Sequence, residues 1–176
     1  GAALLAAPKL HAVQTRSIEH SGFAAFLEGE LDNVSLSSQG LLMPAPALEE
    51  VLKLDDDVIW AALTDDQGHL ILGTGKNGKV YRVDPGEDEP ETLFDPEELM
   101  TRALAIDDEG RIYAGTSPDG RVYRFTPGER PEVFFDPPET YIWDFHLDGE
   151  HLYIATGEKA RLYRIPLDFK PGDEPE

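Results

Sequence analysis

Three copies of one motif fill most of the chain between residues 58 and 166. Aligning Thr74, Thr116 and Thr156 superposes VIWAALTDDQGHLILGTGKNGKVYRVDP, LMTRALAIDDEGRIYAGTSPDGRVYRFTP and YIWDFHLDGEHLYIATGEKARLYRIP, at spacings of 42 residues (Thr74 to Thr116) and 40 residues (Thr116 to Thr156). The pairs Tyr81-Arg82, Tyr123-Arg124 and Tyr163-Arg164 follow the threonines at the same offset in all three copies. Self-similarity at a period of about 40 residues indicates an architecture in which one supersecondary unit is repeated.

Glycines and prolines divide each copy into short runs of strand length. In the first copy these runs cover residues 59–64, 69–73, 79–83 and 91–94, and they are rich in β-branched and aromatic side chains. The connections between them are short, so neighbouring runs pair as an antiparallel meander. Four antiparallel strands repeated in this way are typical of a β-propeller blade. We therefore predict an all-β fold: a β-propeller of about three and a half four-stranded blades, an incomplete ring, with a short N-terminal helix.

The boundaries of these units follow from the repeat and from changes in composition. We predict a signal-peptide remnant or disordered leader over 1–12, a helical segment over 13–33, a partial blade over 34–57, blades over 58–98 and 99–138, a partial blade over 139–166, and an acidic, proline-rich tail over 167–176. Three and a half blades are fewer than the usual four to eight. The chain is therefore expected to be the N-terminal part of a longer propeller protein, with a minimal four-bladed ring or an open, dimerising array as alternatives.

Two features before the repeats lead to expectations of their own. Ser21 is placed to cap a short helix with Phe23, Phe26 and Leu27 on one face. The first partial blade is expected to contain strands near 34–38, 40–43 and 50–54. The Ala/Leu-rich residues 1–12 resemble the second half of a signal peptide, which predicts an extracytoplasmic, periplasmic or secreted protein.

Composition excludes several classes of function. The chain has 35 acidic and 15 basic residues, a formal charge of −20, and no cysteine. The excess of carboxylates disfavours nucleic-acid binding, and no apolar run is long enough for a membrane-spanning helix. Without cysteine there is no disulfide framework, thiolate metal site or thiol nucleophile.

The segment from Gly73 to Lys79, GTGKNGK, has the spacing of a phosphate-binding loop. Such a loop needs a helix after it and a hydroxyl residue after the lysine, whereas Val80 follows here and begins a predicted strand. The third copy reads ATGEKAR and loses the counterparts of Gly73, Gly78 and Lys79. We therefore interpret the segment as a hairpin connection between two strands of a blade.

The repeat IWAALTDDQGHLILGTGKNGKVYRVDP resembles bacterial propeller repeats of the two-component-regulator type, and its second half resembles repeats of the pyrroloquinoline-quinone-dehydrogenase-like type. The resemblance covers residues 58–166. It implies the propeller fold, and it leaves function open because such repeats occur in sensors, scaffolds and enzymes.

One face of the propeller is the expected recognition surface. The loops from strand two to strand three, and from strand four to the next strand one, project from the same face, and loops on a rigid frame commonly carry binding residues. The residues predicted to contact a partner or ligand are those of these loops and of the adjacent start of strand one: Trp60, Lys76, Glu98, Arg102, Glu139 and Trp143.

The first strand of the third copy departs from the repeat at two positions. Asp144 and His146 stand where the other copies carry alanine or leucine, and their spacing places both on one face of the strand. Such a pair could ligate a divalent metal or act as an acid–base couple, as in propeller lactonases of the gluconolactonase type, or it could simply meet solvent at the chain end. No cofactor is predicted beyond this possible metal.

These observations favour a non-catalytic binding or scaffolding module that engages a protein, peptide or carbohydrate. The alternative is part of a metal-dependent, lactonase-like or quinone-dependent enzyme whose remaining blades are absent. Further blades, or a second copy of the chain, are the expected partners of the exposed blade edges.

Overall fold

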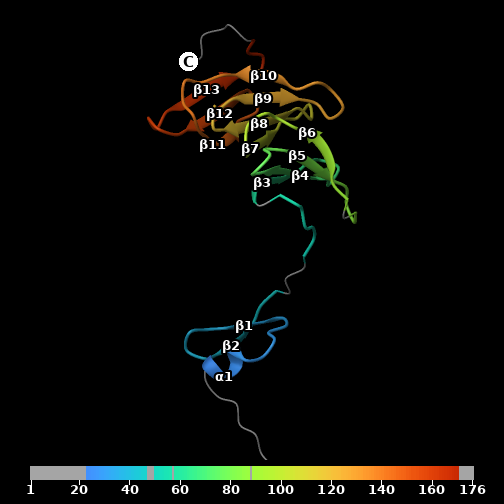
Figure 1. Cartoon of the computed structure of the whole chain (residues 1–176), viewed down its shortest axis with the longest axis vertical. Coiled ribbons are helices and arrows are strands. Elements are labelled where there is room, and N and C mark those ends of the chain that lie inside the picture. The colour runs from blue at the N-terminus through green and yellow to red at the C-terminus, as the bar shows by residue number, and fades with distance from the viewer. Residues whose placement is uncertain (1–22, 47–49, 57, 88, 171–176) are drawn as a thin grey trace, which may run out of the picture. The chain divides into compact units, whose positions relative to one another are not determined.

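The computed structural model describes residues 23–46, 50–56, 58–87 and 89–170. They belong to two compact units, one up to Glu50 and one from Val51 onward (Figure 1). The predicted leader over 1–12, the proposed cap Ser21 and the end of the acidic tail lie outside the described residues.

The first unit contains a short helix and one hairpin. Helix α1 spans Phe23–Leu27, and strands β1 (Val34–Leu36) and β2 (Leu42–Pro44) pair as an antiparallel two-stranded sheet. Residues 50–54, predicted as a further strand, form none in the structure, and Val51 is exposed. Their apolar side chains cluster in sequence without a partner strand among the described residues, so the backbone gains no ladder of hydrogen bonds.

The second unit contains the repeats, and its strands form three antiparallel sheets, which we call blades 1 to 3. Blade 1 consists of β3 (Ile59–Thr64), β4 (Leu70–Thr74), β5 (Val80–Val83) and β6 (Glu91–Phe94). Blade 2 consists of β7 (Met100–Ile106), β8 (Ile112–Ser117), β9 (Val122–Phe125) and β10 (Glu132–Phe135). Blade 3 has three strands, β11 (Ile142–Leu147), β12 (His151–Thr156) and β13 (Leu162–Pro166). Sequential pairing confirms the predicted meander.

Each turn between the first two strands of a blade is organised by one aspartate. Asp148 Oδ1 accepts hydrogen bonds from the backbone N–H groups of Glu150 (3.0 Å) and His151 (2.8 Å). Asp65 and Asp107 accept the corresponding pairs of hydrogen bonds in blades 1 and 2. Asp side chains that bind the backbone two residues on are typical turn formers, which confirms the interpretation of these acidic runs as turns.

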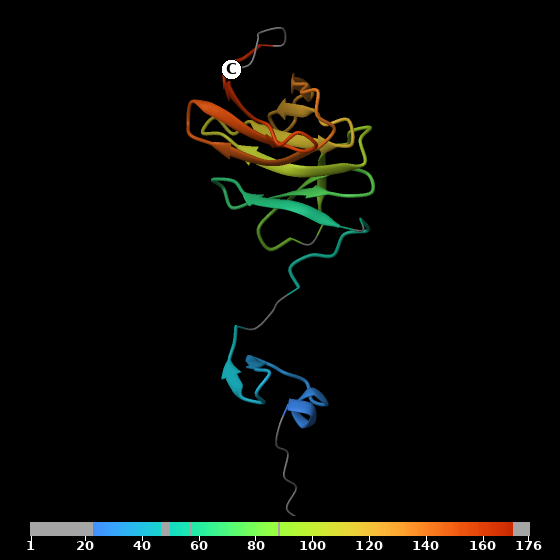
Figure 2. The same cartoon turned by 90° about the vertical axis from the view of Figure 1, so that its left-hand side faces the viewer.

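The blades stack in chain order, and two hydrophobic cores lie between them (Figures 1 and 2). The core between blades 1 and 2 is built on Ile71, Val80, Ile112, Ala114 and Phe125. The core between blades 2 and 3 is built on side chains that include Tyr113, Phe134, Ile142, Leu152 and Ile165. Strand β7 lies against both β3 and β11, so the first strands of successive blades are neighbours.

Glycine allows the close approach of successive blades. A Cβ atom on Gly115 would lie 2.6 Å from Ile142 Cγ2 and 2.8 Å from Phe145 Cζ of blade 3. Gly73 occupies the equivalent position in blade 1 and faces Thr101 of blade 2 in the same way. These two glycines are required by packing between blades rather than by a turn.

The chain folds back onto the core after β13. Phe169 is buried, and its ring contacts the rings of Phe134 (5.7 Å between centroids) and Phe135 (6.2 Å) edge-on. The described beginning of the predicted tail is thus part of the packing between blades 2 and 3. No helix in the described part of the chain is long and apolar enough to cross a membrane.

Candidate functional site

A β-bulge interrupts the first strand of every blade at the same position. The pairing of β3 with β4 skips Trp60, that of β7 with β8 skips Arg102, and that of β11 with β12 skips Trp143. A bulge adds one residue to a strand and redirects its side chain, and bulges are frequent beside functional sites. Trp60, Arg102 and Trp143, which are equivalent in the sequence repeat, are therefore also the residues at which the regular strand pairing is interrupted.

The three bulge residues form one stack across the three blades, which we call the Trp–Arg–Trp stack. The guanidinium carbon of Arg102 lies 4.2 Å from the ring centroid of Trp60 and 4.2 Å from that of Trp143. Both indoles remain accessible, at 41% for Trp60 and 44% for Trp143, whereas Arg102 is half-buried between them. A cation over an indole face is the strongest form of cation–π contact, and here one cation makes two.

Glycines at the ends of β4 and β12 make room for the indoles. A Cβ atom on Gly75 would lie 2.8 Å from Trp60 Nε1, and one on Gly157 would lie 2.6 Å from Trp143 Nε1. In blade 2, where the bulge residue is arginine, the equivalent position is Ser117. The two residue types therefore vary together across the repeat, with glycine wherever the neighbour is tryptophan.

Arg102 differs in its charge partners from five arginines of the blades. Arg82, Arg111, Arg121, Arg124 and Arg161 each form an ion pair with at least one carboxylate. Among the residues that the structure describes, no carboxylate forms an ion pair with Arg102, whose contacts are the two indoles. Its cation is stabilised by ring faces, and its N–H groups are not engaged by an acidic side chain of the described chain.

Glu98 and Glu139, predicted at the loop face, are buried instead of projecting from it. Tyr123 Oη donates to Glu98 Oε1 (2.9 Å), and Tyr163 Oη donates to Glu139 Oε2 (2.8 Å). Arg121 and Arg161 pair with the same two carboxylates at 3.1 and 3.2 Å. Each glutamate stands four residues before the bulge residue of its blade, so the contact repeats with the motif.

The same contact occurs in blade 1 with a shorter acidic side chain. Tyr81 Oη donates to Asp56 Oδ2 at 2.9 Å. Burial, the hydrogen bond to Asp56 and its negative charge raise the pKa of Tyr81 to about 12. The tyrosine therefore stays protonated and acts as a donor at any physiological pH. In each blade, the acidic residue before the first strand is thus hydrogen-bonded to a tyrosine on the third strand.

Lys76 lies in the loop between β4 and β5, which has the spacing of a phosphate-binding loop in the sequence. Its backbone φ is 68°. Strand β5 follows the loop directly, so the helix that a phosphate cradle requires is absent from residues 75–83 of the described chain. In the third copy Ala160 keeps the positive φ, 51°, that Gly78 has in the first. The loop geometry is thus maintained even where the glycine is lost.

Asp144 and His146 are both exposed on β11. Their counterparts in blade 2, Ala103 and Ala105, are buried in the core shared with blade 3. The two polar side chains therefore lie on the face of blade 3 that points away from blade 2. Among the described residues, no group of three or more His, Asp and Glu side chains is arranged to hold a metal.

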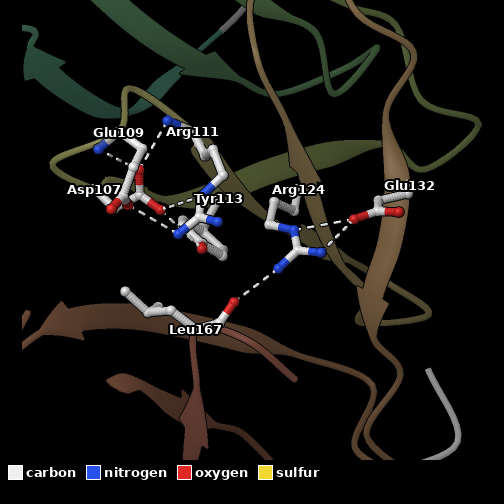
Figure 3. Close-up of polar contacts among 7 residues, drawn as sticks. All are labelled: Asp107, Glu109, Arg111, Tyr113, Arg124, Glu132 and Leu167. Atoms are coloured by element: carbon white, nitrogen blue, oxygen red, sulfur yellow. Dashed lines mark hydrogen bonds and ion pairs between the residues drawn. The ribbon is translucent and has the colours of Figure 1, made fainter. Parts of the chain in front are cut away.

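The opposite end of the blades carries a polar network that the sequence did not indicate (Figure 3). Arg111 Nε lies 2.6 Å from Asp107 Oδ2, to which Tyr113 Oη also donates at 3.0 Å. Arg124 donates to the backbone carbonyl of Leu167 at 2.9 Å and so links blade 2 to the segment after β13. The repeated Asp at the turn and the arginine of the repeated Tyr-Arg pair belong to this network, but neither reveals the cross-blade partner Leu167.

The comparisons with known proteins concern the fold. No family model and no curated protein matches the chain. Among solved structures, it is similar to a catalytically inactive variant of virginiamycin B lyase from Staphylococcus aureus with quinupristin, with a TM-score of 0.57 and 14% identity over 78% of this chain. A selenomethionine form of the same lyase matches with a TM-score of 0.53 and 16% identity over 64% of this chain. The chain has a β-propeller fold.

The likeness extends over only part of those lyases. This chain spans 46% of the first structure and 39% of the second. At 14 to 16% identity the comparison establishes the propeller architecture and carries no activity across. The function of this propeller must be argued from its own residues.

Proposed function

We propose that this propeller is a non-catalytic binding module that recognises a peptide, protein or carbohydrate through the face that carries the Trp–Arg–Trp stack. The observation that supports the proposal is the stack itself: two accessible indoles and one arginine from three blades, redirected by three equivalent bulges. Tryptophan and arginine are the residue types most enriched in binding hot spots.

The rigidity of the stack also favours binding. Each indole packs closely against the glycine that directly follows the neighbouring strand, and the guanidinium lies between two rings. A ligand that uses these groups therefore loses little side-chain entropy on binding. The stack belongs to the sheets, which position side chains more accurately than loops do.

We also propose the context in which the module works. Three blades are fewer than a propeller usually has, which supports a longer parent protein with further blades. The Ala/Leu-rich residues 1–12 support an extracytoplasmic location. The similarity of the repeats to two-component-regulator-type and quinone-dehydrogenase-like repeats supports a bacterial-type scaffold.

The experiment is a binding selection against the purified chain, using a displayed heptapeptide library and an array of neutral and acidic oligosaccharides. We expect a set of ligands whose affinity falls ~10-fold or more in Trp60→Ala and in Trp143→Ala, because a central aromatic side chain typically contributes that much. Val133→Ala is the control, since Val133 is an exposed apolar residue on the outer strand β10. Failure to select any ligand, or ligands that bind Trp60→Ala and Trp143→Ala as well as the unaltered chain, would contradict the proposal.

A further inference from the structure

The geometry around Arg102 restricts what can still bind to it. A ring lies over the guanidinium carbon at 4.2 Å from each of two sides, Trp60 and Trp143. Because an indole lies close to the guanidinium carbon on either side, a ligand can reach only those N–H groups that point away from the two rings. Five N–H donors in a fixed planar fork match a planar, bidentate acceptor, and a carboxylate has that shape.

The charge of the chain makes the unpaired arginine informative. The sequence has 35 acidic residues for 15 basic ones, and five other arginines of the blades are paired with carboxylates. Arg102 forms no such pair with a described residue, so in a chain so rich in carboxylates it is available to a carboxylate from outside. The indoles also hold its position, so the fork is oriented before the ligand arrives.

We propose that Arg102 clamps a single carboxylate of a peptide ligand, either an Asp or Glu side chain or the C-terminal group, while the flanking apolar side chains of that peptide contact the two indoles. The proposal rests on the proposed function and names its ligand class. It makes Arg102 the residue that determines specificity and leaves the indoles to supply general affinity.

Two observations favour a sparsely charged peptide over an acidic polysaccharide. The net charge of −20 repels every charged group of a polyanion, whereas a peptide with a single carboxylate has only one group that is repelled. An exposed apolar side chain, Val58, lies beside Trp60, since both are close to the position of a Cβ atom on Gly75. A carboxylate flanked by aliphatic or aromatic side chains complements an arginine with this surrounding.

The test uses peptides selected from the heptapeptide library and their amide counterparts, with Asp replaced by Asn, Glu by Gln, or the C-terminus amidated. Titration calorimetry against the unaltered chain should show ~10- to 100-fold weaker binding of the amide form, the range for a hydrogen-bonded charge. Arg102→Met keeps an unbranched side chain between the indoles and should bind both forms equally weakly. Arg102→Lys should recover only part of the preference, because an ammonium lacks the planar fork.

Each outcome separates this inference from the proposed function. Selected peptides that depend on Trp60 and Trp143 but bind equally well as acid and amide would overturn the carboxylate clamp and leave the binding module standing. Selection of glucuronate oligosaccharides in place of peptides would overturn the ligand class. Selection of no ligand at all would overturn both proposals.

Discussion

At the scale of single residues, the sequence aligned the three bulge residues but did not show how they meet. Alignment of the repeats placed Trp60, Arg102 and Trp143 at equivalent positions of the first strands, and the structure brings them into one stack. Arg102 can insert between the two indoles because of the bulges. Apart from the glycines at 75 and 157, nothing in the sequence indicates these bulges.

The turn aspartates allow a prediction of pH dependence. The backbone N–H groups of Glu150 and His151 donate to Asp148 and lower the pKa of its carboxyl from 3.8 to about 2. Since the folded state favours the carboxylate, Asp148 contributes stability above pH ~4, and this contribution disappears as the pH falls towards 2. We expect Asp148→Asn, which can still accept these hydrogen bonds, to lose less stability than the unaltered chain between pH 4 and 2.

Urea unfolding at a series of pH values between 2 and 6 measures this difference. Glu150→Gln removes a negative charge from the same turn without removing the acceptor and serves as the control. Parallel stability curves for the unaltered chain and Asp148→Asn over the whole range would show that the carboxylate has no special role in the turn.

At the scale of elements, strands were predictable and the burial of loop residues was not. The four strands of blade 1 lie within one residue of the runs read from the sequence, because Gly, Pro and Asp mark their ends. Glu98 and Glu139 stand in connecting loops, where glutamate is normally exposed, yet both are buried against tyrosines. Their positions are explained by their contact partners, Tyr123 on β9 and Tyr163 on β13, which come 25 and 24 residues later in the sequence.

These buried contacts should contribute to the stability of the blades. Tyr163→Phe removes the donor to Glu139 and leaves a carboxylate oxygen buried without that hydrogen bond. We expect the free energy of unfolding to fall by ~1–3 kcal/mol, the cost of leaving a buried polar group unsatisfied. Tyr153→Phe is the matched control, because its hydroxyl donates to the exposed Asp148, and its effect should be smaller. Equal losses in the two variants, measured by urea unfolding, would show that the burial of Glu139 adds nothing.

At the scale of the whole propeller unit, stability comes from the two cores between blades. Blade 2 is covered on both faces, whereas blades 1 and 3 each have one face that no other blade covers among the described residues. The repeat predicted stacking of this kind, because one small sheet cannot bury both of its faces. It could not predict that Phe169 continues the core after β13, since the composition around it is that of an acidic tail.

The uncovered faces and the net charge act in opposite directions on self-association. Leu162 on β13 is 67% exposed, and an apolar residue on an edge strand favours pairing with another chain. A charge of −20 repels a second copy at low salt, and this repulsion is screened when the Debye length falls from about 10 Å at 0.1 M salt to about 3 Å at 1 M.

Sedimentation velocity should therefore show a monomer at low salt and increasing association as NaCl is raised. Leu162→Gln, which leaves the charge unchanged, should reduce that association, whereas Leu27→Gln, at 57% exposure in the N-terminal unit, should not. A chain that remains monomeric at every salt concentration would mean that the uncovered blade faces do not attract one another, and an effect of Leu27→Gln alone would place the contact in the N-terminal unit.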